Sequence, residues 1–65
     1  MMEERDICYC FKVRVKCNNG MHRNEVYRVS EKPGRLGEAV ALGKCCRYYE
    51  QLQTMKTIKE YRIMA

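Results

Sequence analysis

The stretch that decides the fold is Ile7–Cys17, which reads Ile-Cys-Tyr-Cys-Phe-Lys-Val-Arg-Val-Lys-Cys. Its odd-numbered positions up to residue 15 are all apolar, and its even-numbered positions from residue 12 to residue 16 are all cationic. Such strict alternation is typical of a β-strand with one buried face and one solvated face. No other alternating pattern in the chain is as long. We therefore expect this segment to be the central strand of a sheet whose solvated face is basic.

A tight turn follows at Asn18-Asn19-Gly20, because asparagine and glycine tolerate the positive φ angles that hairpin turns need. A three-residue loop would place Phe11 opposite Tyr27, whereas a two-residue Asn-Gly turn would place Phe11 opposite Arg28. Matched apolar neighbours favour the three-residue loop. The second strand is then predicted over residues 21–30.

The pair Pro33-Gly34 predicts a loop at the end of the second strand, and a helix is expected over residues 35–53. Gly43 would allow this helix to approach the sheet closely. The apolar residues with the three- and four-residue spacing of one buried stripe are Ala39, Leu42, Cys45, Cys46, Tyr49 and Leu52.

The last segment, residues 55–64, is predicted to be a third strand with Tyr61 and Ile63 on its buried face. Ile58 is out of step with them, which a bulge or a position at the sheet edge would explain. A right-handed crossover places this strand beside the first one. The predicted fold is therefore α+β with ββαβ order, a three-stranded antiparallel sheet of strand order 2-1-3, and one helix on one face.

Length and composition indicate one small domain over residues 1–65, with residues 1–5 as a charged, flexible tail. The chain has five cysteines, an odd number that excludes a complete set of internal disulfides. Its acidic start does not resemble a signal peptide, and no apolar run approaches the length of about 20 residues that a membrane span needs. We expect a cytoplasmic protein with reduced thiols and no membrane association.

The net charge of +5 is unevenly distributed, because from Ile7 onward 12 basic residues outnumber 5 acidic ones. Such a bias favours polyanionic partners. We expect a small, non-enzymatic binding protein that contacts nucleic acid through phosphates, with little sequence preference because its aromatic residues point into the core. An acidic protein is the alternative partner. The predicted contact residues are Lys12, Arg14, Lys16, Arg28, Lys56 and Arg62.

Other chemistry has weaker support. Cys8 and Cys10 share a strand face and are weak candidates for a metal site, but there is no pair of CxxC motifs, so no metal or cofactor is predicted. The segment from Gly37 to Lys44 departs from the phosphate-loop pattern in spacing and in the residue after the lysine. The alternative function is a homodimeric protein-interaction module. It would explain two cysteines on an otherwise solvated face and the small size of the core.

Overall fold

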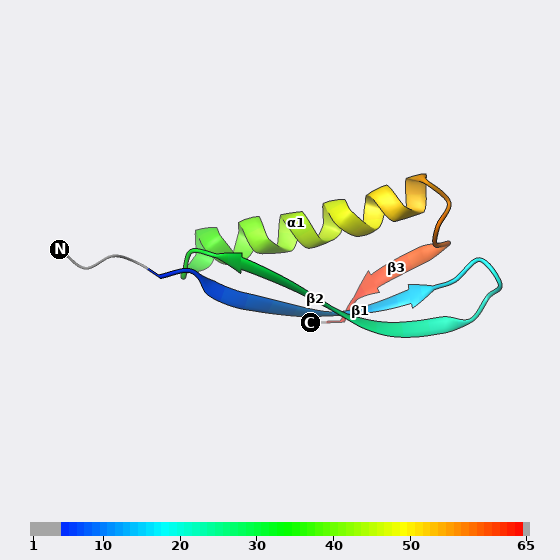
Figure 1. Ribbon diagram of the computed structural model, residues 1–65, viewed down its shortest axis with the longest axis horizontal. Coiled ribbons are helices and arrows are strands. Elements are labelled where there is room, and N and C mark those ends of the chain that lie inside the picture. The colour runs from blue at the N-terminus through cyan, green and yellow to red at the C-terminus, as the bar shows by residue number, and fades with distance from the viewer. Residues whose placement is uncertain (1–4, 65) are drawn as a thin grey trace.

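The computed structural model describes residues 5–64 and contains three strands and one helix. The elements are β1 (Ile7–Lys16), β2 (His22–Glu31), α1 (Arg35–Thr54) and β3 (Glu60–Ile63). The sheet order is β2-β1-β3, and both neighbouring pairs are antiparallel. Helix α1 lies along one face of the sheet and leaves the other face open (Figure 1). The predicted α+β fold and strand order are confirmed, while the tail expected at residues 1–5 lies almost entirely outside the described residues.

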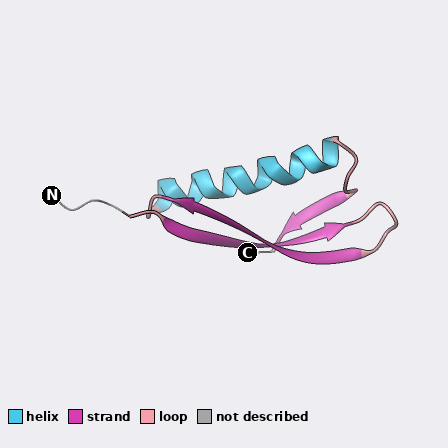
Figure 2. Cartoon of the chain, viewed as in Figure 1, coloured by secondary structure: helices cyan, strands magenta, loops and turns pink. Residues whose placement is uncertain are grey.

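The hairpin between β1 and β2 has the three-residue loop predicted from the sequence. The backbone N–H of Cys17 donates to the carbonyl of Met21 at 2.7 Å, and Gly20 has the positive φ of 88° that this loop requires. Phe11 consequently lies opposite Tyr27. The register places every odd-numbered residue of both strands on the same face as the buried Val13 and Val15, which is the face that α1 covers. Figure 2 shows the two long strands lying side by side beneath the helix.

The core lies between α1 and the part of the sheet where β3 is present. Its fully buried residues come from β1, α1 and the segment before β3. They are Val13, Val15, Cys45, Tyr49 and Ile58. The hydroxyl of Tyr49 donates to the Glu25 carboxylate at 3.0 Å, so the one polar group of this core is satisfied. Burial first, and this hydrogen bond second, raise the pKa of Tyr49 above its ordinary value.

The buried stripe of α1 differs from the prediction. It follows a four-residue spacing through Gly37, Ala41, Cys45 and Tyr49, whereas the predicted core positions Ala39 and Leu42 are exposed. Each step of four residues completes one turn of the helix and goes about 40° beyond it, so this line of residues winds slowly around the helix axis. The buried line therefore rotates toward β2 at the N-terminal half of α1, and it leaves the flank that carries Ala39 and Leu42 uncovered.

The close approach of α1 occurs at Gly37 and not at Gly43, where it was expected. A Cβ atom on Gly37 would lie 1.6 Å from the carbonyl oxygen of Lys32, while a Cβ on Gly43 would meet nothing within 4 Å. The same carbonyl of Lys32 accepts a hydrogen bond of 2.9 Å from the hydroxyl of Tyr9. The loop before α1 is thus held against both the first turn of the helix and the start of β1.

Strand β3 is shorter than predicted, because it begins at Glu60 instead of residue 55. The preceding residues complete the end of α1: the N–H of Thr57 donates to the carbonyl of Leu52, and Lys56 has a positive φ of 60°. Ile58 precedes the strand and is buried, which explains why it was out of step with Tyr61. β3 lies at the edge of the sheet, one of the two alternatives that the sequence left open.

The molecule is elongated, with extents of 53 × 19 × 13 Å and a radius of gyration of 13.8 Å. A compact chain of this length has a radius of gyration of about 11 Å. The elongation arises because β3 pairs only with the Val13–Lys16 half of β1. We call that half of the molecule the three-stranded end, and the half that holds Ile7–Phe11 the two-stranded end.

Candidate nucleic-acid interface

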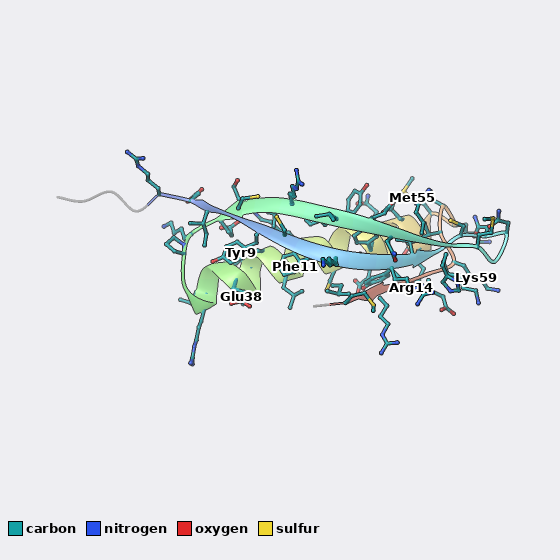
Figure 3. The ribbon with its side chains drawn as sticks, turned by 90° about the horizontal axis from the view of Figure 1, so that it is seen from below. Tyr9, Phe11, Arg14, Glu38, Met55 and Lys59 are labelled. Carbon is teal, nitrogen blue, oxygen red and sulfur yellow. The ribbon has the colours of Figure 1, made fainter. Side chains whose placement is uncertain are left out.

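The sheet face that α1 does not cover, here called the open face, carries the even-numbered residues of all three strands. Alternation requires this, since the odd-numbered Val13 and Val15 are buried under the helix. Figure 3 shows the molecule from this side, with Arg14 on β1. The cationic residues of the open face are Lys12, Arg14, Lys16, Arg28 and Arg62.

Five of the six predicted contact residues therefore share one face, and the sixth does not. Lys56 lies in the turn between α1 and β3, before the strand begins, and its carbonyl accepts a hydrogen bond of 2.8 Å from the Asn18 side chain. The prediction for Lys56 assumed a longer third strand. That assumption is wrong, because the N–H groups of residues 55–57 donate to carbonyls of α1 and β3 begins only at Glu60.

The central feature of the open face is a pair of arginines. Arg14 of β1 lies directly opposite Arg62 of β3 in the antiparallel register. Side chains at such positions have Cβ atoms about 5 Å apart, and like charges there destabilise the sheet. Among the strand residues that lie on the open face, the one acidic residue is Glu60, which lies opposite Lys16. Two arginines are thus held side by side without a carboxylate between them.

The ion pairs of the described residues lie away from the cations of the open face. The two ion pairs found within residues 5–64 are Arg23 Nε with Glu25 Oε2, at 2.8 Å, and Lys44 with Glu31. Neither pair includes a cation of the open face. The positive charge of this face is therefore available to an external anion.

Two shallow depressions mark the surface beside the arginine pair. One has a volume of about 250 Å³ and is lined by Arg14, Lys16, His22, Glu60, Tyr61 and Arg62. The other, of about 400 Å³, is lined by Lys12, Val13, Asn24, Glu25, Val26 and Met64. The lining of the first is predominantly cationic, whereas the lining of the second includes the apolar side chains of Val26 and Met64.

No protein-family model, curated protein or solved structure matches the chain. Its function must therefore be inferred from its own geometry. No helix within the described residues is both long and apolar enough to cross a membrane.

The aromatic side chains of the strands lie on the opposite side from the cations. Tyr27 and Tyr61 contact Tyr49 of α1, with ring centroids 6.1 and 5.6 Å away, respectively. Tyr48 is partly exposed but packs against Tyr27 on the helix side, with ring centroids 5.2 Å apart. Within residues 5–64, no tyrosine or phenylalanine ring lies on the open face as a platform for a base.

Two cysteines occupy the open face at the two-stranded end. Cys8 and Cys10 are exposed, and Cys10 lies opposite Arg28. Desolvation raises the pKa of the Cys8 thiol, and its interaction with Cys10 adds to the effect. No group of three or more metal-binding side chains occurs in the part of the chain that the structure describes.

Some residues of the interface were absent from the sequence prediction. His22 was assigned to the solvated face but not to the contact set, and Glu60 was not considered. Both line the cationic depression because the register sets them on either side of Lys16. The open-face position of Glu60 could have been predicted from Tyr61 and Ile63, which were expected on the buried face. Adjacent residues of a strand point to opposite faces.

Proposed function

We propose that the protein is a non-enzymatic nucleic-acid-binding protein whose open face contacts the phosphate backbone. The observation that carries the proposal is the placement of Arg14 opposite Arg62 with no carboxylate paired to either one. Such an arrangement costs stability in the free protein. A bound polyanion would remove that cost by placing negative charge between the two guanidinium groups, which also bind phosphate through paired hydrogen bonds.

The spacing of the cations suits a backbone. Lys12, Arg14 and Lys16 follow one another on β1 at intervals of about 7 Å, twice the rise per residue of a strand. Arg28 and Arg62 extend the positive surface onto the strands on either side. Phosphate contacts position a protein on nucleic acid without reading its sequence. Since the open face has no tyrosine or phenylalanine rings for bases, we expect affinity from charge and little sequence preference.

The first test is a titration of labelled single-stranded and duplex oligonucleotides at different salt concentrations. If all five cations neutralise phosphates, the slope of log affinity against log salt will be about −4.5 for duplex DNA and about −3.5 for a single strand. Duplex binding should weaken about 500-fold between about 50 and 200 mM salt. Absence of binding at the lower salt concentration would overturn the proposal and favour an acidic protein as the partner.

A pair of charge-reversed variants tests whether the face, and not the net charge, is responsible. The double substitution Arg14→Glu/Arg62→Glu should abolish measurable binding at low salt. Arg35→Glu/Arg47→Glu changes the net charge equally but alters exposed residues of α1 on the other side of the sheet. We expect this control to retain binding within about threefold, because distant charges are screened. Equal losses in the two double variants would show that net charge alone governs binding.

The proposal places the protein in the cytoplasm. Its five cysteines are all free thiols, which is usual for a reducing compartment. Partition of the intact protein between cell fractions, followed with an antibody, would test this placement directly.

A further inference from the structure

The edge of β1 that faces β3 has no pairing partner along the two-stranded end. The N–H of Met64 donates to the carbonyl of Lys12 at 2.7 Å, and the N–H of Lys59 donates to the carbonyl of Lys16 at 2.9 Å. Even-numbered residues of β1 therefore direct their backbone groups toward β3. By the same alternation, Cys8 and Cys10 direct theirs toward this edge, where nothing in residues 5–64 pairs with them. An unpaired edge of this kind is a template for another strand.

The flank of α1 above this edge is uncovered, and it carries the apolar side chains of Ala39 and Leu42 beside the charged Arg35 and Glu38. Lys44 pairs with Glu31 of β2, so that side of the helix lies over β2, whereas Glu50 accepts a hydrogen bond from Tyr61 of β3. Leu42 is two helical turns before Glu50 and shares its flank. At the two-stranded end β3 is absent, so this flank faces solvent. Leu42 is 39% exposed there.

We propose that a second copy of the chain occupies this edge, pairing its own β1 antiparallel to the first. A two-fold axis beside Cys8 would place Cys8 opposite Cys8 of the partner subunit. It would also set Ile7 opposite the partner subunit's Tyr9, with both of these apolar residues on the helix side. The two sheets become one, the two helices lie on the same side, and their uncovered flanks face each other across the axis.

Charge and hydrogen bonding favour a second copy over an unrelated strand. The same axis places Asp6 opposite the partner subunit's Cys10 and diagonal to its Lys12, within reach of the lysine side chain. Asp6, Cys10 and Lys12 are all even-numbered and so share the open face. The Lys12 carbonyl already accepts a hydrogen bond from Met64, so an incoming strand can pair with β1 only as far as Cys10. A two-fold axis at Cys8 satisfies this limit. One contact thus covers both unpaired edges and both uncovered flanks.

The test is the oligomeric state of the reduced protein without nucleic acid, measured by sedimentation equilibrium up to about 100 μM, since a dimer depends on protomer concentration. We expect a reversible dimer. Leu42→Glu should raise the dimer dissociation constant tenfold or more, the effect of removing about 1.4 kcal/mol of contact energy. Val40→Glu is the matched control, since Val40 is also exposed on α1 but lies four residues before Lys44, on the flank over β2 and away from the proposed interface. It should leave the dissociation constant nearly unchanged.

Mild oxidation of the dimer tests the proposed register between the two β1 strands. A Cys8 to Cys8 crosslink is expected, because residues in a hydrogen-bonded antiparallel pair have Cα atoms about 5.5 Å apart, which suits a disulfide. Cys8→Ser should abolish the crosslink and Cys10→Ser should preserve it. A monomer at every concentration, or equal effects of Leu42→Glu and Val40→Glu, would overturn the proposal. Since no nucleic acid is present, these outcomes are independent of the proposed function.

Discussion

The two ends of the sheet share one strand pattern and differ in what that pattern produces. At the three-stranded end, Val13 and Val15 are almost completely buried. At the two-stranded end, Ile7 belongs to the same alternating series but is 44% exposed, and Tyr9 is only half-buried. The difference is β3, which lies beside the first pair and not beside the second. Alternation decides which face a residue points to, but a neighbouring strand decides whether that residue becomes core.

The open face also differs between the two ends of the sheet. At the three-stranded end, β3 brings Arg62 beside Arg14 and creates the cationic depression. At the two-stranded end, the corresponding positions of β1 are Cys8 and Cys10, with no strand on one side. The short third strand therefore completes both the core and the proposed binding surface, and the rest of β1 is left for a different contact.

The largest expected effect is a difference in stability between core substitutions at the two ends. Tyr49→Ala should destabilise the fold by about 3–5 kcal/mol, because a large buried side chain leaves a cavity and its hydrogen bond to Glu25 is lost. Ile7→Ala should cost less than about 1 kcal/mol, since its side chain is already half in solvent. Urea denaturation of both variants measures these changes. Similar losses of unfolding free energy in the two variants would mean that the two-stranded end is packed in solution as tightly as the three-stranded end.

A second comparison concerns two glycines of the same helix. Gly37→Ala should destabilise the protein by about 1–3 kcal/mol, because the new methyl group would overlap the carbonyl of Lys32 and force the loop away from α1. Gly43→Ala should stabilise it by about 1 kcal/mol, since its surroundings are open and alanine favours the helix. Thermal unfolding followed by circular dichroism gives both values. Stabilisation by both alanines would show that the loop contact at the two-stranded end is loose.

The sequence predicted the parts of this fold that depend on local signals. The loop at Asn18–Gly20 set the hairpin register, and alternation over residues 7–17 then assigned every β1 residue to a face. The helix stripe was less predictable: Ala39 and Leu42 have core spacing, but they lie beside the four-residue line that the sheet covers. The start of β3 was missed because the N–H groups of residues 55–57 donate to the last carbonyls of α1, a competition that periodicity does not describe.

The candidate site also contains some residues that local sequence patterns predicted and others that they did not. Lys12, Arg14 and Lys16 followed from one strand's alternation, and Arg28 followed from the hairpin register. Lys56 was assigned to the site only through an overlong third strand. The contact between Arg14 and Arg62 required the register between two strands that are distant in the sequence, and the irregular pattern of β3 does not fix that register.

The smallest expected effect is the most informative about the three-stranded end. Arg62→Glu converts the like-charged pair with Arg14 into an opposite-charged one, so it should stabilise the fold by about 0.2–1 kcal/mol. The same change should weaken nucleic-acid binding at least about tenfold, because it removes one phosphate contact and neutralises another. Opposite shifts in stability and affinity are the signature of a surface whose charges serve binding at the expense of the free fold. Chemical denaturation and the oligonucleotide titration, done on one preparation, measure both. If Arg62→Glu left both quantities unchanged, the arginine pair would be an ordinary solvated surface.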